Sequence, residues 1–396
     1  MLEYLIIITL GVIAGVFTGL IPGIHPNTVI FGSLPFYFSS GIDSLVFLSF
    51  LSGLSVSHTF HDFLPAIFIG APEAESALST LPGKQMAERG RGLEAFRYTA
   101  TGGLFSVLVL VAVSPLLFLF LKPVYSIASQ AMGLIVLFFL VFIFFSSRNR
   151  FYSALIILFS GLTGLISFDM AVNGQFVMVP IFTGLFAVPE LYASYRGEKI
   201  PEQYETSINR KKAFKGGFTG FLAGLLAGTV PGIGGAVSTS FLAPLIDSSK
   251  RRFLAAMGAV NTSDIITSFI VLAVLAEARS GASVALHSIM AVNYRISAFL
   301  IGASLFSVGA SFLLAFKVSR LVVKLLDRVD FSSICVLAFL AILGTVFGLT
   351  GFQGLLILAT SSSIGFIASL TGERKSCMAV LLVPVLLYFV GSGIFI

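Results

Sequence analysis

The sequence predicts an all-α protein that crosses a membrane many times. Of its 396 residues, 57% are hydrophobic and only 11% are charged, and the mean hydropathy is +1.01. Soluble domains carry about 25% charged residues, whereas a bilayer-spanning helix needs about 20 mostly apolar residues in a row. Such stretches recur along the whole chain, separated by short basic loops, so the fold class is a polytopic helical membrane protein.

The basic residues are topology signals. They gather in short stretches between the apolar segments, namely 84–97, 148–150, 196–215, 250–252, 317–328 and 374–375. Loops rich in lysine and arginine stay on the cytoplasmic side of a membrane. We therefore expect a multi-pass protein of the cell membrane, in contact with the lipid bilayer. We expect no nucleic-acid partner, because the net charge of +6 forms no basic face separate from the membrane.

The chain contains an internal repeat. AGVFTGLIPGIHPNTVIFGSLPF (14–36) aligns without a gap with AGLLAGTVPGIGGAVSTSFLAPL (223–245), at a constant offset of 209 residues. Such self-similarity indicates two copies of one structural unit. We place the first membrane repeat at 1–195 and the second at 214–396, joined by a polar linker at 196–213. We expect both repeats to interlock in one transmembrane domain.

Each repeat shows the same order of elements. We expect a helix that ends at a Pro-Gly pair, a half-helix, a long apolar helix rich in small polar residues, a loop or hairpin, and three or four further spans. A Pro-Gly pair marks the expected break after the first helix of each repeat. The ranges in the first repeat are 4–21, 27–40, 44–70, 71–97, 98–121, 123–146, 151–168 and 170–193. Those in the second are 214–230, 235–247, 252–276, 277–294, 295–318, 330–350, 352–370 and 376–395. Together they predict about 10–12 transmembrane spans.

The two Pro-Gly breaks, Pro22-Gly23 and Pro231-Gly232, predict an anion-binding site. A backbone group without a partner in hydrocarbon costs several kcal/mol, so broken helices occur where they are buried in protein or line a cavity. In secondary transporters two broken segments meet near the midplane, and their half-helix N-termini face anionic groups. A proline kink relieved by neighbouring helices is the alternative. The expected substrate-binding residues are Pro22, Gly23, Asn27, Thr28, Pro231, Gly232, Gly234, Gly235, Ser238 and Thr239.

A polar cluster follows each half-helix. His58, His61 and Asp62 share one helix face, and Asp264 ends the run NTSD in the second repeat. Ionisable residues inside membranes mark functional sites, and oxygen ligands suit a hard cation. We expect a coupling ion, Na⁺ or H⁺, at His58, His61, Asp62, Asn261, Thr262 and Asp264. A helix–helix hydrogen-bond cluster is the alternative. A catalytic metal is less favoured, because the HExxH pattern is incomplete.

These motifs resemble the TctA-type large membrane subunit of tripartite tricarboxylate transporters, in its shorter, archaeal-like form. The resemblance rests on GLIPGIHPNT (19–28), AGTVPGIGGAVSTSFLAPL (227–245) and LPGKQMAERGRGLEAFRYTATGG (81–103), and covers most of the chain. It implies inverted repeats, an elevator-type architecture, and carboxylate transport with Na⁺ or H⁺ and no other cofactor. It also implies a homodimer, a small membrane subunit and an extracytoplasmic binding protein. His25 and Pro26 depart from the family pattern, which leaves the substrate and the partner subunits open.

The sequence therefore predicts an ion-coupled secondary transporter of a small organic anion, with a di- or tricarboxylate as the favoured cargo, and no enzymatic activity. Two other functions fit part of the pattern. A translocase of a polyprenyl-phosphate lipid would use the same helix ends, although no arginine stands near them in the sequence. An intramembrane metal-dependent enzyme would use His58, His61 and Asp62.

Overall fold

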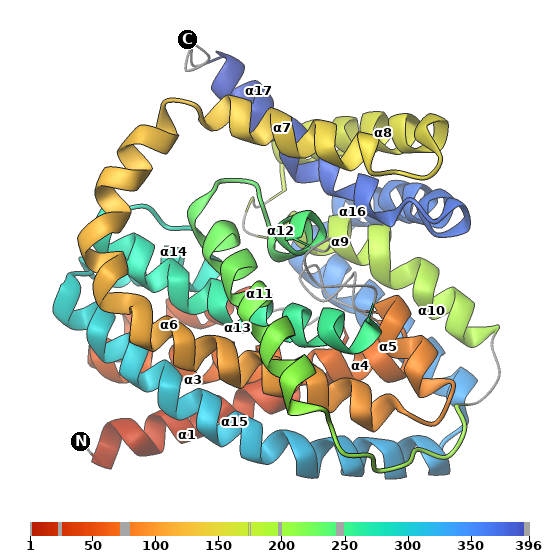
Figure 1. Ribbon diagram of the computed structural model, residues 1–396, viewed down its shortest axis with the longest axis horizontal. Helices are drawn as coiled ribbons and strands as arrows, with labels where there is room; N and C mark the ends of the chain where they lie inside the picture. The colour runs from red at the N-terminus through yellow and green to blue at the C-terminus, as the bar shows by residue number, and fades with distance from the viewer. Residues whose placement is uncertain are drawn as a thin grey trace.

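The computed structural model describes residues 2–22, 26–71, 80–172, 174, 176–196, 200–242 and 249–391, and every regular element in these ranges is a helix (Figure 1). Seven of the helices in these ranges are long and apolar enough to cross a membrane. The predicted all-α, multi-pass membrane fold is thus confirmed. The spans are Leu2–Leu20, Gly92–Ser129, Arg150–Asp169, Lys250–Leu275, Tyr294–Leu326, Ser332–Thr371 and Arg374–Gly391.

The helices fall into a first half and a second half around residues 200–209. The first half contains α1 (Leu2–Leu20), α2 (Pro26–Ser40), α3 (Ser44–His61), α4 (Phe63–Phe68), α5 (Thr80–Ala87), α6 (Gly92–Ser129), α7 (Met132–Phe145), α8 (Arg150–Asp169), α9 (Met178–Phe182), a π-helical turn (Thr183–Ala187) and α10 (Val188–Tyr195). The second half contains α11 (Arg210–Thr229), α12 (Gly235–Leu242), α13 (Lys250–Leu275), α14 (Gly281–Ile289), α15 (Tyr294–Arg328), α16 (Phe331–Thr371), a 3-10 turn (Arg374–Met378) and α17 (Ala379–Gly391).

The two predicted breaks are present at matching positions. Helix α1 ends at Leu20 and α2 begins at Pro26, while α11 ends at Thr229 and α12 begins at Gly235. Both ends in the second half follow their counterparts by 209 residues, the offset of the sequence repeat. A further break occurs inside α16, where Gly351 has φ +62° and a non-helical ψ. This glycine separates the expected spans 330–350 and 352–370.

One boundary predicted from the sequence is wrong. Helix α6 continues through Pro115 and Pro123 to Ser129, where two spans divided near residue 122 were expected. Single prolines are tolerated in membrane helices because neighbouring groups satisfy the freed backbone. In the second half, the range 277–294, expected to be a loop or hairpin, contains the helix α14. The side chain of Ser280 caps α14 by accepting a hydrogen bond from the amide of Ser283.

The helices pack into two groups, each drawn from both halves of the chain (Figure 1). The lower group in Figure 1 consists of α1, α3, α6, α11, α13 and α15, and the upper group of α7, α8, α9, α10, α16 and α17. Helices α11 and α12 lie towards the boundary between the groups. Buried side chains of α6, α13 and α15 form one core, and those of α8, α9, α16 and α17 form another.

Stripes of glycine join the first helix of each half to its third helix. A Cβ at Gly11 would lie 2.2 Å from the carbonyl oxygen of Phe50 in α3, and one at Gly220 would lie 2.2 Å from that of Ala256 in α13. The backbones therefore touch directly, as small residues allow at membrane helix interfaces. The stripe on α1 is Gly11, Gly15 and Gly19, and the stripe on α11 is Gly220, Gly224 and Gly228, again 209 residues later.

The basic loops meet at one end of the bundle, here called the basic end. A connected set of contacts joins them: Lys84–Ser194, Lys250–Gln85, Arg251–Glu94, Arg97–Glu205, Arg320–Glu205, Arg374–Glu190 and Asn149–Glu373. Ser194 and Glu190 both lie on α10, so every one of these loops is at the same side of the membrane. By the positive-inside rule this side faces the cytoplasm.

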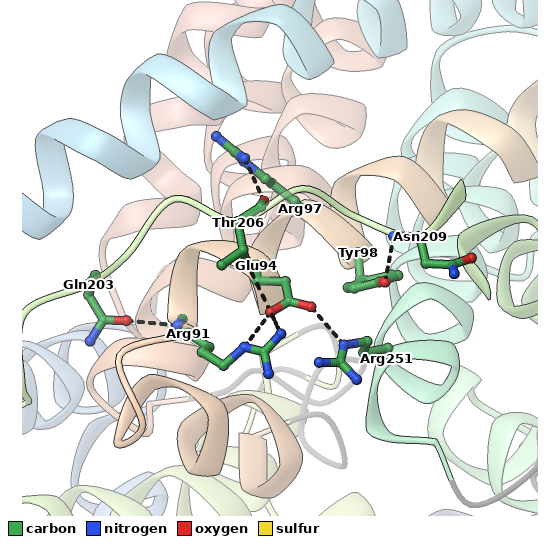
Figure 2. A network of polar contacts seen from close by, with 9 residues as sticks. Arg91, Glu94, Arg97, Tyr98, Gln203, Thr206, Asn209 and Arg251 are labelled. Atoms are coloured by element: carbon green, nitrogen blue, oxygen red, sulfur yellow. Dashed lines mark hydrogen bonds and ion pairs between the residues drawn. The ribbon is translucent and has the colours of Figure 1, made fainter. Parts of the chain in front are cut away.

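The polar linker lies against the segment 81–103 (Figure 2). The amide of Gly92 donates to Gln203 Oε1 at 2.7 Å, and the amide of Asn209 donates to the Tyr98 hydroxyl at 2.8 Å. Arg97 Nη1 donates to the carbonyl oxygen of Thr206 at 2.8 Å. The segment that carries part of the family resemblance therefore holds the connection between the two halves.

Glu94 fixes this contact from inside the protein. Its side chain is buried and accepts hydrogen bonds from Arg91 Nε at 2.6 Å, Arg251 Nε at 2.7 Å and the Thr206 hydroxyl at 3.1 Å (Figure 2). A carboxylate removed from water needs charged partners of this kind. Glu94 thereby ties α6, the linker and the start of α13 together at the basic end.

Candidate functional site

A cavity of about 540 Å³ lies where the two helix groups meet the second break. Its walls come from both halves of the chain: α3, residues 230–235, α13, the turn 278–282, and apolar side chains of α8, α9 and α17. Cavities of this size are typical of small-ligand sites, which occur preferentially between helices of bundles. The polar residues in its lining are Ser55, His58, Thr59, Asp62, Asn261, Asp264, Arg279 and Ser280.

The second break supplies one wall of this cavity. Val230 leaves the helix with an extended backbone, and Gly232 has φ +74°, a left-handed conformation that favours glycine. Helix α12 then begins at Gly235, and the amides of Val237 and Ser238 both donate to the carbonyl oxygen of Gly234 at 3.1 Å, so the amides of Gly235 and Ala236 are the ones that precede the first hydrogen bond of the helix. A Cβ added at Gly234 would meet no atom within 4 Å, which places this residue beside open space.

The structure brings four of the predicted substrate-binding residues of the second half to the cavity. Pro231, Gly232, Gly234 and Gly235 line it, whereas Ser238 and Thr239 do not. Ser238 is buried, and its hydroxyl donates to the carbonyl oxygen of Gly235 at 3.1 Å within its own helix. Thr239 is also buried, on the adjacent position of α12.

The first break contributes Pro26, the first residue of α2, to the same cavity. Pro22 is partly exposed and does not line it. Gly23 lies outside the described residues. Asn27 and Thr28 occupy the first turn of α2, and their side chains also lie outside the described part of the chain.

The predicted coupling-ion residues divide into two sets. His58, Asp62, Asn261 and Asp264 line the cavity, whereas His61 and Thr262 do not. His61 Nδ1 lies 2.7 Å from the carbonyl oxygen of Ser57 in its own helix. The Thr262 hydroxyl donates to the carbonyl oxygen of Gly258 at 3.1 Å, which is a contact within α13.

Asp62 and Asn261 form the contact between the halves at this site. Asn261 Nδ2 donates to Asp62 Oδ2 at 2.9 Å, and both side chains are buried, at 2% and 4% exposure. His58 Nδ1 lies 3.0 Å from the Thr18 hydroxyl of α1. Asp264 is partly exposed and sits beside the glycine stripe of α11, because a Cβ at Gly228 would lie 3.1 Å from Asp264 Oδ1.

Sequence reasoning missed four polar residues of the cavity, Ser55, Thr59, Arg279 and Ser280, of which Arg279 is the only charged one. Helix α13 ends at Ala276, whose left-handed φ of +57° turns the chain back so that residues 278–282 line the cavity. Arg279 pairs with Glu277 and donates to the Tyr125 hydroxyl at 2.5 Å. The expectation that no arginine lies near the breaks is therefore wrong. An arginine inside an apolar field was the available signal, but its location depends on the turn at Ala276.

No group of three or more His, Cys, Asp or Glu side chains that could hold a metal ion occurs among the residues that the structure describes. His58 and Asp62 line the cavity together, but His61, the third residue of the possible metal set, does not. Most of the polar side chains that line the cavity carry oxygen atoms, the ligand type that hard cations prefer.

The comparisons with known proteins agree with this picture. Residues 5–380 match the family described as the tripartite tricarboxylate transporter TctA family. The chain is 26% identical over 402 residues to the uncharacterized protein MJ1079 of Methanocaldococcus jannaschii, covering 97% of this chain and 98% of that protein. It is 30% identical over 211 residues to an uncharacterized 52.8 kDa protein of Agrobacterium vitis, covering 48% of this chain and 41% of that protein. No solved structure matches the chain.

Proposed function

Because the chain belongs to the TctA family of tripartite tricarboxylate transporters, we propose that it is an ion-coupled secondary transporter of a small organic anion, with a di- or tricarboxylate as its cargo. One observation carries the proposal. A single cavity is lined by the broken backbone at 230–235, by the carboxylates Asp62 and Asp264 and by the cation Arg279. These are the groups needed to bind an anion and a coupling cation together.

The anion is proposed to bind at the start of α12 and at Arg279. The first amides of α12 and the positive end of the helix dipole favour a carboxylate there. Gly234 leaves room for the anion to approach the backbone, since a Cβ there would meet nothing within 4 Å. Arg279 offers a second, fixed positive charge in the same cavity. Two separate anion-binding elements suit a cargo with more than one carboxylate.

The coupling ion, Na⁺ or H⁺, is proposed to bind at Asp62 and Asp264 with Asn261 and His58. A buried, unpaired charge is costly, and Na⁺ or H⁺ at these two carboxylates offsets part of the charge of a bound polycarboxylate. The cation and the polycarboxylate therefore each favour the binding of the other, and this mutual effect couples their transport. Asn261 holds Asp62 in place through its 2.9 Å hydrogen bond.

We also propose that the two halves are inverted repeats. At the start of α1, Tyr4 packs against Phe299 of α15 with ring centroids 5.4 Å apart. Arg320 lies 21 residues further along α15, which is about 31 Å along a helix, and it shares a groove with Arg210 at the start of α11. Helices α1 and α11 therefore enter the bundle from opposite ends, which supports opposite orientations of the two halves.

The arrangement supports an elevator-type movement in which one helix group moves against the other. The cavity lies between the two groups, so their relative displacement changes the side from which it is reached. Alternating access in such carriers is largely rigid-body movement around a fixed site. As in other tripartite systems, a small membrane subunit and an extracytoplasmic binding protein are the proposed partners, and a homodimer is the proposed assembly.

Ligand-induced thermal stabilisation of the purified protein tests this function. We expect citrate or succinate to raise the melting temperature in the presence of Na⁺ or at low pH, and acetate to have a smaller effect. The same selectivity is expected for uptake into proteoliposomes. Stabilisation by a polyprenyl phosphate alone would indicate the lipid translocase instead, for which Arg279 also offers a phosphate partner.

A pair of glycine variants makes this test specific to the site. Gly234→Val extends into open space beside the cavity and is expected to abolish the carboxylate-dependent shift. Gly302→Val is the matched control. A Cβ at Gly302 in α15 also meets nothing within 4 Å, but Gly302 does not line the cavity. An unchanged carboxylate response in Gly234→Val would exclude the proposed site.

A further inference from the structure

A second hollow of the molecule lies outside the transport cavity, at the basic end. It is a groove of about 790 Å³ between the start of α6, residue Ile208 of the linker, the start of α11 and the end of α15. None of its lining residues lines the cavity described above. The groove therefore needs an explanation of its own.

The groove is polar at one end and aromatic at the other. On α6 the lining residues are Arg97, Thr101 and Phe105, and on α15 they are Phe312, Phe316 and Arg320. Residues spaced by four share one helix face, so each helix presents a single stripe to the groove. In both stripes the arginine is at the basic end and the most distant phenylalanine lies eight residues further into the membrane, about 12 Å along the helix.

Helix α11 completes the same pattern from a third side. Arg210 and Lys211 line the groove at its basic end, and Phe214 lines it one turn deeper. The rings of Phe105 and Phe214 lie 4.2 Å apart and form the apolar floor. Phe214 is 54% exposed, so this floor is open to the surrounding membrane.

The basic end of the groove carries more positive than negative charge. Glu205 of the linker pairs with Arg97 at 2.9 Å and with Arg320 at 2.5 Å. Figure 2 shows Arg97 turned away from Glu94, on the other side of the linker. Arg210 and Lys211 have no acidic partner among the residues that the structure describes. Of the four cations that line the groove, two thus share the carboxylate of Glu205.

We propose that this groove binds one anionic phospholipid of the cytoplasmic leaflet, with its phosphate at Arg210 and Lys211 and an acyl chain over the phenylalanine floor. A soluble anion would leave the exposed aromatic floor uncovered, and an uncharged lipid would leave the two cations without a counter-charge. Basic pockets between transmembrane helices on the cytoplasmic side favour acidic lipid head groups. The groove offers basic side chains for the phosphate of such a lipid and an aromatic floor for its acyl chain.

Lipid binding to three variants of the purified protein, compared with wild type, tests this proposal. Arg210→Gln/Lys211→Gln removes the two cations, whereas Lys212→Gln/Lys215→Gln removes the same charge from the same helix outside the groove. Each basic residue near an anionic lipid changes affinity by roughly fivefold. We therefore expect phosphatidylglycerol to bind the first variant about 25-fold more weakly, and the second with nearly unchanged affinity. Arg210→Lys/Lys211→Arg should retain binding.

Native mass spectrometry and thermal shift provide the two measurements. One phosphatidylglycerol per chain, no equivalent binding of phosphatidylcholine and no stabilisation by inorganic phosphate would support the proposal. Equal binding of both lipids, equal losses in the two glutamine variants, or stabilisation by inorganic phosphate would overturn it. Retention of a protein partner instead of lipid, lost in Arg210→Gln/Lys211→Gln, would also overturn it. Carboxylate transport is not part of this readout, so a failure here leaves the proposed transport function untouched.

Discussion

Replacing Asn261 by alanine should weaken cation binding at Asp62 without unfolding the helix bundle. Asn261 Nδ2 donates to Asp62 Oδ2 at 2.9 Å from the opposite half of the chain, and both side chains are buried. Without this donor the carboxylate loses the group that orients it towards the cavity. Asn261 already lines the cavity, so its truncation to alanine enlarges an existing space and opens no new one in the apolar core.

The expected magnitude follows from that contact. A hydrogen bond to a charged group contributes about 1.5–3 kcal/mol, which corresponds to a loss of roughly 10- to 150-fold in affinity if the cation depends on this orientation. The matched control is Thr262→Val on the same helix. It removes only neutral hydrogen bonds, one to the carbonyl oxygen of Gly258 at 3.1 Å and one with the Thr59 hydroxyl at 3.3 Å, and such bonds in membrane proteins average about 0.6 kcal/mol.

Cation-dependent thermal shift and uptake into proteoliposomes measure both variants. For half-maximal stabilisation of the protein by a carboxylate, we expect Asn261→Ala to need at least tenfold more Na⁺ or, if the coupling ion is H⁺, an at least tenfold higher proton concentration. Thr262→Val should lower the melting temperature slightly and leave the cation dependence unchanged. Wild-type cation dependence in Asn261→Ala, or an equal change in Thr262→Val, would refute the assignment of Asp62 and Asn261 to the ion site.

Three other predictions address the cavity charge, the helix packing and the linker. Arg279→Gln should reduce binding of citrate at least tenfold more than binding of acetate, as isothermal titration can measure; equal losses for both would contradict a second carboxylate at Arg279. Gly220→Ala should destabilise the fold by more than about 1 kcal/mol in thermal denaturation, because its Cβ would lie 2.2 Å from the carbonyl oxygen of Ala256. In the control Gly302→Ala the new Cβ meets nothing within 4 Å, so this variant should be neutral or stabilising in the same measurement. Hydrogen bonds from Arg320 and Arg97 lower the pKa of the Glu205 carboxyl below its ordinary value of 4.5. Its contribution to stability is therefore complete above pH 4.5 and is lost as the pH falls through the lowered pKa. The difference in melting temperature between wild type and Glu205→Gln should vanish in that acidic range, and a difference that persists there would contradict the ion-pair interpretation.

Local sequence signals were sufficient where a single residue type enforces a backbone conformation. Pro22 and Pro231 located both breaks, and the 209-residue offset matched the ends of α1 and α11. Gly351, with φ +62°, ended a span where the sequence suggested. In each case a proline or glycine determines the local geometry without help from distant contacts.

Tertiary contacts decided the features that sequence reasoning missed. Pro123 does not end α6, because the packing around a membrane helix can tolerate a proline. Arg279 reaches the cavity only because the chain reverses at Ala276. His61 and Thr262 have the residue types of an ion site, yet helix rotation turns them away from the cavity. Spacing alone fixes which residues share a face, but not which neighbour that face meets.

The glycine stripes on α1 and α11 have a mechanical consequence. Where the backbones of two helices are in direct contact, no change of side-chain rotamer can accommodate sliding of one helix along the other. Helices α1 and α3 therefore form one rigid pair, and α11 and α13 form another. Each pair is followed by a helix break of which described residues, Pro26 in the first half and 230–235 in the second, line the cavity. We therefore expect each pair of helices to move as one rigid unit in any conformational change of the protein.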